Sequence, residues 1–133
     1  HLHGNIRLAK TSGPNCQYTT EFYPIEGTEL DLNKHFCKAG YSLRPHVVWF
    51  GEAVPAYTDA QACIQDADIL VVIGTSLQVY PVAGLIHEIP PECAAYYIDP
   101  KADQQYLPAQ FHKISQTATE GMKTLLSLFD PKV

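Results

Sequence analysis

The segment Ile69-Leu70-Val71-Val72-Ile73-Gly74-Thr75-Ser76 decides the fold class of this chain. Its first five residues are apolar and rich in β-branched side chains, which suits a strand that is buried on both faces. The glycine then ends the strand. Strands of this kind belong to parallel sheets covered by helices, so we expect residues 69–73 to form a central strand of an α/β fold.

Helices and strands alternate on both sides of this segment. Residues 57–67 place four apolar side chains on one helical face, and residues 46–50 and 94–98 are short apolar runs that suit strands. The remaining expected elements are a helix at 81–88, a strand at 112–115 and a helix after Thr117. This order predicts a parallel sheet with right-handed crossovers.

The first third of the chain has a different character. Residues 5–44 are rich in threonine, serine, asparagine and glycine with isolated aromatics, and they sustain neither helical nor strand periodicity. This predicts an irregular small module, with regular structure from Pro45 onward.

Composition excludes several classes of protein. The chain has 133 residues, 46% hydrophobic and 17% charged, which argues against disorder. Its net charge of −5, without a basic stripe, argues against nucleic-acid binding, and no apolar run is long enough to span a membrane. The four cysteines are widely scattered, which indicates reduced thiols in a cytoplasmic protein.

Polar segments follow three of the expected strands. Ligands of open parallel sheets bind beyond the carboxyl ends of the strands. Here these ends carry Gly51-Glu52, Gly74-Thr75-Ser76 and Asp99, which offer close backbone approach, hydroxyl groups and a carboxylate for ribose hydroxyls. Ordinary strand-to-helix turns remain an alternative interpretation. The Gly-rich dinucleotide fingerprint does not occur in these 133 residues, so a dinucleotide-binding fold would have its first half outside them.

Three motifs of this chain match the pattern of one protein family. Residues 74–81, GTSLQVYP, resemble its G-T-S-L-x-V-x-P segment, and residues 44–52, RPHVVWFGE, resemble R-P-x-V-V-x-F-G-E. His3-Gly4 resembles the H-G pair at the end of the catalytic strand. Together the three motifs resemble the sirtuin family of NAD-dependent protein deacylases. The second motif is most similar to the bacterial branch related to desuccinylating sirtuins.

The resemblance implies a fold and a division of the chain. The fold would be the C-terminal half of a Rossmann-like parallel α/β sheet. Residues 1–4 would end the catalytic strand, residues 5–44 would be a remnant of the small module, and residues 45–133 would belong to the NAD-binding domain.

The resemblance also implies roles for individual residues. His3 would be the general base that deprotonates a ribose hydroxyl after the acyl oxygen has displaced nicotinamide. The NAD-binding residues would be Gly74, Thr75, Ser76, Asp99 and Ala118, although a simple capping role competes for Ala118.

The substrate would be an acyl-lysine peptide or protein carrying acetyl or succinyl groups. Val48 and Phe50 would line the tunnel for the acyl-lysine stem, and Val48 suits a plain buried core equally well. The peptide would be held as an added strand by main-chain hydrogen bonds. Its partners would be Gly51, Glu52, Gln78, Val79 and Tyr80.

Two positions depart from the family pattern. Most members have asparagine where this chain has Asp99, which adds negative charge near the pyrophosphate. The family's two C-x-x-C pairs are replaced by Cys16 and Cys37 alone, with His35 nearby. Structural zinc needs four nitrogen or sulfur ligands, so we expect no metal.

Two other functions stay open at this point. ADP-ribosyl transfer would use the same activated ribose, and a non-catalytic nucleotide-binding or interaction domain would need no catalytic histidine. An upstream G-A-G phosphate loop would favour the enzyme.

The isolated 133-residue chain should show no measurable deacylase turnover, because the phosphate-binding half is not among its residues. An assay with NAD and an acyl-lysine peptide checks this. Appreciable acyl removal by the chain alone would show that the missing-half argument is wrong.

Overall fold

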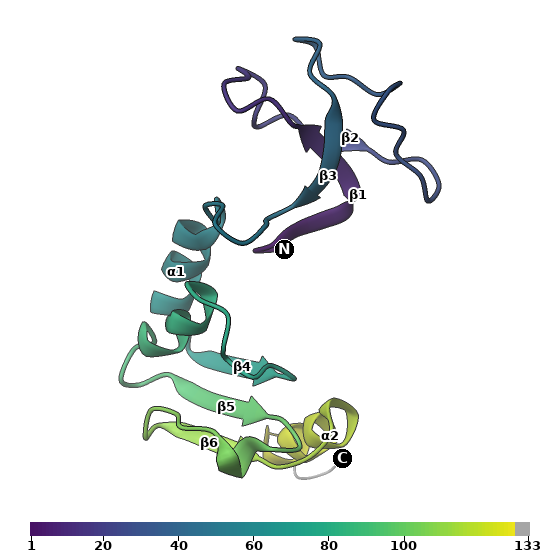
Figure 1. Ribbon diagram of the computed structural model, residues 1–133. Helices are drawn as coiled ribbons and strands as arrows, with labels where there is room; N and C mark the ends of the chain where they lie inside the picture. The colour runs from purple at the N-terminus through teal and green to yellow at the C-terminus, as the bar shows by residue number, and fades with distance from the viewer. Residues whose placement is uncertain (130–133) are drawn as a thin grey trace. The chain divides into compact units, whose positions relative to one another are not determined.

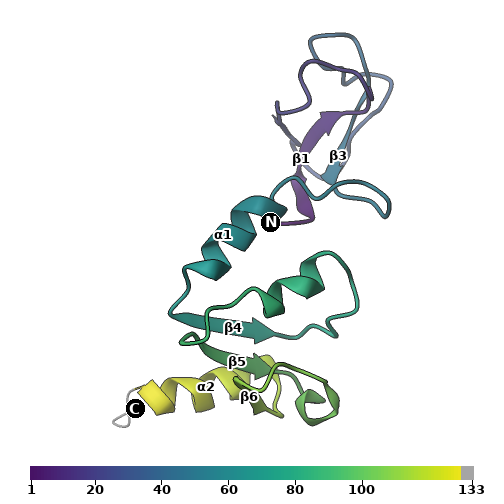
Figure 2. The same ribbon diagram turned by 90° about the vertical axis from the view of Figure 1, so that its left-hand side faces the viewer.

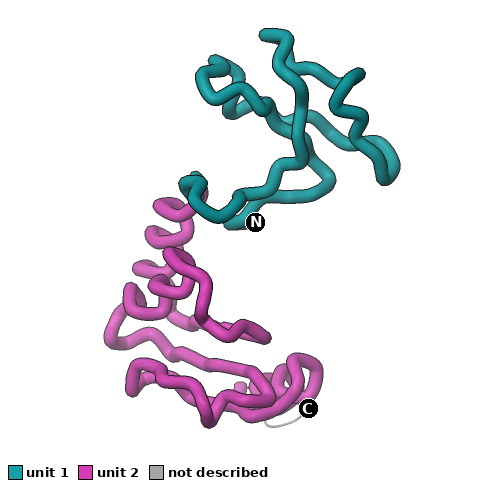
Figure 3. The backbone as a smooth tube through the Cα atoms, viewed as in Figure 1, with its two compact units in different colours: residues 1–55 teal, residues 56–133 magenta. Residues whose placement is uncertain are grey.

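A computed structural model describes residues 1–129, so the last four residues of the predicted 45–133 domain lie outside the described residues. The chain divides into two compact units, His1–Pro55 and Ala56–Val133 (Figure 3). Each unit has its own sheet and its own core.

The sheet of the second unit is parallel and has the order β4-β5-β6 (Figure 1). Its strands are β4 Ile69–Ile73, β5 Ala94–Ile98 and β6 Phe111–Ile114. The expected bounds of β4 and β5 are confirmed. The expectation that residues 69–73 are central is wrong for the described sheet, because β5 lies in the middle and Ile69 is 50% exposed.

Helical segments cover both faces of this sheet (Figure 2). Because side chains alternate along a strand, Ala95 and Tyr97 point to one face and join Ile86 in a buried cluster. Ile98 points to the other face, against Gly121. The helical elements are α1 Tyr57–Gln65, the 3₁₀ segments η1 Val82–His87 and η2 Ala102–Gln104, and α2 Ala118–Phe129.

The segment expected as a helix at 81–88 is a 3₁₀ helix. Its backbone bonds include two of the i→i+3 type, from Gly84 to Pro81 at 2.9 Å and from Glu88 to Leu85 at 3.0 Å. Gly84 in its middle, together with β-branched neighbours, weakens the preference for a regular α-helix.

The first unit is more regular than the sequence indicated. It holds an antiparallel sheet in the order β2-β1-β3, made of β1 Gly4–Thr11, β2 Tyr23–Pro24 and β3 Leu43–Val47. Ala9, Cys16, Cys37 and Leu43 form its buried core. The expectation that residues 5–44 are irregular is therefore wrong at β1 and β2.

The strand expected at 46–50 is also corrected. β3 ends at Val47 and pairs antiparallel with β1, so it does not belong to the parallel sheet. After Val47 the chain leaves the sheet, and Trp49 and Phe50 are 57% and 95% exposed. A short apolar run does not reveal which sheet a strand joins.

Gly121→Ala should destabilise the second unit by about 1–3 kcal/mol, which is typical of overpacking. A Cβ at this position would lie 2.2 Å from Cγ2 of Ile98, a side chain that is fully buried. Alanine's higher helix propensity, about 1 kcal/mol, does not offset that clash. Urea unfolding measures the change. Gly84→Ala is the control, because its Cβ would meet only the Tyr80 ring at 3.6 Å; equal effects of the two variants would contradict the packing argument.

Candidate functional site

The residues expected to bind NAD follow the carboxyl ends of the three parallel strands. Gly74-Thr75-Ser76 follows β4, Asp99 follows β5, and Ala118 begins α2 after β6. Because the three strands are parallel and adjacent, these ends lie along one edge of the sheet. The structure therefore brings the predicted cofactor residues together within the second unit.

The turn after β4 has a conformation that favours glycine. Gly74 has a φ of +62°, and a Cβ there would meet nothing within 4 Å, so the turn leaves open space above its backbone. The Gly74 amide still donates to the Ile98 carbonyl at 3.0 Å. The turn is thus fixed to β5 while one side stays accessible.

The Tyr97 side chain holds the same turn, and the sequence analysis did not identify this residue. Its side chain is completely buried, and its hydroxyl donates to the Thr75 carbonyl. Burial, and then the nearby Asp99 carboxylate, raise the pKa of Tyr97, so the hydroxyl stays protonated as a donor. A tyrosine in a buried strand needs a partner for its hydroxyl, which is the signal that could have identified it.

The Asp99 carboxylate is held by local backbone. Its Oδ1 accepts from the Lys101 amide at 2.8 Å, and its own amide donates to Ile114 at 3.2 Å. Asp99 is partly exposed at the end of β5. It is therefore an oriented acceptor for hydroxyl groups.

The segment expected to bind peptide in the second unit is largely exposed. Gln78 donates through Nε2 to the Ser76 carbonyl at 3.0 Å. Val79 and Tyr80 are 47% and 70% exposed. The Val79 carbonyl accepts from the Ala83 amide at 2.9 Å, and the substrate role of this segment stays a prediction.

His3 lies in the first unit, in a turn directly before β1. Its carbonyl accepts from the Val48 amide at 2.9 Å, so the candidate base is tied to the start of the 48–52 loop. Gly4 has a φ of +95°, and a Cβ there would lie 2.0 Å from the His46 carbonyl oxygen. This close approach explains why glycine must follow His3.

Residues 48–52 form a closed loop after β3. The Glu52 amide donates to the Trp49 carbonyl at 3.0 Å, and the Trp49 amide donates to Glu52 Oε2 at 3.2 Å. Gly51, at φ +85°, allows the turn. Val48 is half-buried and Phe50 is exposed.

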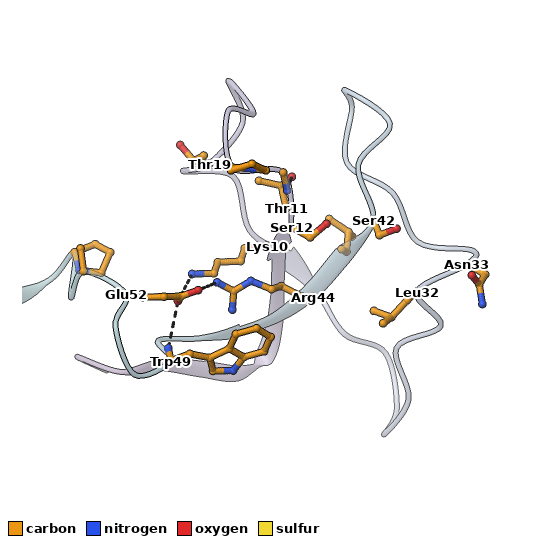
Figure 4. Close-up of a pocket in the computed structure, with 15 residues that line it drawn as sticks. Lys10, Thr11, Ser12, Thr19, Leu32, Asn33, Ser42, Arg44, Trp49 and Glu52 are labelled. Carbon is orange, nitrogen blue, oxygen red and sulfur yellow. Dashed lines mark hydrogen bonds and ion pairs between the residues drawn. The ribbon is translucent and has the colours of Figure 1, made fainter.

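A cavity of about 730 Å³ borders this loop in the first unit (Figure 4). Its lining includes Lys10, Arg44, Trp49 and Glu52. Lys10 and Arg44 both pair with the Glu52 carboxylate, and the Arg44 hydrogen bond is the main cause that holds the pKa of Glu52 below its usual range. The sequence placed Arg44 inside a motif but gave it no role.

Cys16 and Cys37 are close together. Both thiols are buried, with their Sγ atoms 3.6 Å apart. Burial alone would raise the pKa of Cys37, but hydrogen bonds with Thr11, Ala39, Tyr41 and Cys16 outweigh burial and lower that pKa to about 7.

Within residues 1–129, no group of three or more histidine, cysteine, aspartate or glutamate side chains is placed to hold a metal. His35 is exposed, and its Nδ1 shares a hydrogen bond with the Asp31 carbonyl at 2.9 Å. In the same range, no helix has the length and apolar character that a membrane crossing needs.

Comparison with known proteins identifies the family. A Sir2 family model matches residues 1–81. An NAD-dependent protein deacylase of Bacteroides thetaiotaomicron is 40% identical, with 98% of this chain and 56% of that protein covered. One of Helicobacter pylori is 39% identical, with 95% and 52% covered. The chain belongs to the Sir2 family and spans about half the length of these relatives.

Solved structures agree with this assignment. A Sir2 homolog in complex with NAD matches with a TM-score of 0.73 and 30% identity, covering 96% of this chain and 49% of that one. A mutant Sir2 homologue with ADP-ribose matches with a TM-score of 0.73 and 29% identity, with 96% and 51% covered. The Rossmann-like α/β fold expected from the sequence is confirmed.

Purified protein should contain well under one zinc per chain, and chelators should leave its thermal midpoint unchanged. Two thiols supply only half of the four ligands that closed tetrahedral zinc requires. Elemental analysis and thermal melts with and without chelator measure this. One zinc per chain would contradict it and make Cys16, His35 and Cys37 the first residues to substitute.

Proposed function

We propose that the protein of which this chain is part removes acyl groups from protein lysines and consumes NAD. The observation that carries the proposal is the hydrogen bond from the Val48 amide to the His3 carbonyl, which joins a candidate general base to a candidate substrate loop. The relatives in Bacteroides thetaiotaomicron and Helicobacter pylori, both named NAD-dependent protein deacylases, support the same activity.

The residues at the edge of the parallel sheet fit the cofactor. Gly74 offers open space above its backbone, Ser76 offers a hydroxyl, and Asp99 is an oriented carboxylate that accepts from ribose hydroxyls. Ala118 begins α2 along the same edge. NAD, when bound, supplies the ADP-ribosyl group that receives the acyl group as nicotinamide leaves.

His3 acts as the general base in this proposal. Its side chain is exposed, and imidazole is the side chain that most often serves as a general base for a hydroxyl near neutral pH. The turn that holds it is fixed by the Gly4 amide, which donates to the His1 carbonyl at 3.1 Å.

In this proposal the peptide backbone of the substrate pairs with residues of two segments, 51–52 and 78–80. Main-chain hydrogen bonds hold an added strand with little dependence on sequence. Val48 and Phe50 contact the apolar stem of the acyl-lysine. We extend the proposal to acetyl and succinyl groups because the 44–52 motif resembles the desuccinylating branch.

The remaining parts of the proposal rest on the sequence. Cysteine usage favours the cytoplasm, and the net charge of −5 favours a protein substrate over nucleic acid or a membrane. The division at residues 1–4, 5–44 and 45–133 stays a prediction, beside the compact units that divide at Pro55.

In the complete gene product, His3→Ala should lower turnover by about 10²–10⁴-fold, the usual contribution of a general base, and leave NAD affinity nearly unchanged. Ser76→Ala should instead weaken NAD binding by roughly 0.5–1.5 kcal/mol, the value of one hydrogen bond. Steady-state kinetics and calorimetric NAD titration measure both effects.

His1→Ala is the matched control, because it removes the same side chain from the same turn. It should retain normal turnover. If His3→Ala is as active as His1→Ala, the catalytic role is wrong and a nucleotide-binding module becomes the better interpretation. Unchanged thermal midpoints separate lost chemistry from lost folding.

A further inference from the structure

The 48–52 loop is held by a charged cluster that the sequence motif does not explain. Glu52 closes the loop through both its amide and its carboxylate, each bonded to the Trp49 backbone. The same carboxylate accepts from Arg44 Nη2 through Oε1 and lies 3.6 Å from Lys10 Nζ through Oε2 (Figure 4). One side chain thus joins the loop to β1 and β3.

Arg44 fixes the loop at three points. Its Nη1 donates to the Val47 carbonyl at 3.0 Å, its Nη2 donates to Glu52, and its guanidinium lies 4.4 Å from the centre of the Trp49 ring. A planar guanidinium can make these contacts together, whereas a lysine ammonium can make only part of them. Arg44 therefore fixes the end of β3, the loop and the Trp49 ring in one arrangement.

The side chains of the cluster are buried enough for these contacts to stabilise the loop. The side chains of Arg44 and Lys10 are only 15% and 17% exposed, and that of Glu52 is 33% exposed. Charge-assisted hydrogen bonds are stronger than neutral ones, and partial burial reduces their screening by salt. The Lys38–Glu21 pair of the same unit is more exposed, at 62% and 35%, and holds no such loop.

The loop that the cluster holds exposes two aromatic side chains to solvent. Phe50 is 95% exposed and Trp49 is 57% exposed on a loop whose backbone is nonetheless fixed. A loop ordered before binding loses less conformational entropy when its ligand arrives. An exposed apolar pair on a fixed loop is suited to cover the apolar part of an incoming ligand.

We propose that Arg44 and Glu52 are positioning residues that hold the 48–52 loop ready for the acyl-lysine peptide, so that their ion pair sets the KM for peptide. This inference rests on the proposed function. Arg44 acts through the loop and does not touch the reacting atoms. Glu52 contributes its amide and its carboxylate to closing the loop, so its role is to position the loop for the peptide.

The first test needs no substrate. Trp49 is the single tryptophan of the chain, so its fluorescence reports on the loop alone. Glu52→Gln and Arg44→Met should increase acrylamide quenching of Trp49 about twofold or more, because the loop and the ring are released. Glu21→Gln, which removes the Lys38 pair in the same unit, should leave quenching unchanged.

The pH dependence supplies a signature of the ion pair. The pKa of Glu52 is lowered in the folded protein, so the pair is intact at neutral pH and is lost only as the pH falls through that lowered value. Quenching in the unchanged protein should therefore rise only below the usual glutamate pKa of about 4.3. In Glu52→Gln the quenching of Trp49 should be high at every pH.

The second test is kinetic and uses the complete gene product. Glu52→Gln and Arg44→Met should raise the KM for acyl-lysine peptide about tenfold, while kcat and the KM for NAD stay within about twofold. Arg44→Lys should recover part of the loss, because it restores the charge without the planar fork. Glu21→Gln should behave as the unchanged protein.

The outcomes separate this inference from the proposed function. Normal KM and quenching in Glu52→Gln, in an active enzyme, would overturn the positioning role and leave the deacylase proposal intact. A fall in kcat with unchanged KM would also overturn it. No acyl removal by the unchanged complete protein would overturn the proposed function and, with it, this inference.

Discussion

The burial of β5 on both faces is the constraint on which the second unit depends. Ala95, Tyr97 and Ile98 are completely buried, and they contact helical segments on opposite sides of the sheet. β5 also pairs with a parallel strand on each edge, so its carboxyl end fixes the ends of β4 and β6. The row formed by Gly74-Thr75-Ser76, Asp99 and Ala118 follows from that alignment. The candidate cofactor edge is therefore a consequence of core packing.

The first unit has a very small core, and it carries a polar turn and an exposed loop. Gly4 approaches the His46 carbonyl so closely that no side chain fits, and this contact holds the turn of His3 against β3. The loop beyond β3 has few apolar contacts to hold it. Charged hydrogen bonds around Glu52 take that role, which leaves the aromatic side chains available to a ligand.

The sequence predicted what local pattern determines and missed what depends on distant pairing. The bounds of β4 and β5 were predictable because both strands are continuous apolar runs that end at Gly74 and Asp99. β1 was missed because a register shift between Asn5 and Ala9 breaks its alternation, so that two exposed residues follow one another. Asp99 and Gly74 could be placed at strand ends from the sequence. The sequence could show that Tyr97 needs a partner for its hydroxyl, but it could not identify that partner, Thr75, which is 22 residues away.

The candidate residues of the two units are therefore held in place by different kinds of interaction. The candidate cofactor residues lie at or just after strand ends, where strand pairing and the Tyr97 hydroxyl bonded to the Thr75 carbonyl determine their positions. The candidate base and substrate loop depend on a handful of specific contacts, the Val48–His3 bond and the Glu52 cluster. A site built on strand ends tolerates surface substitutions, whereas a loop held by one carboxylate does not. The proposed peptide binding should therefore respond to substitutions around Glu52, with the candidate cofactor edge left unchanged.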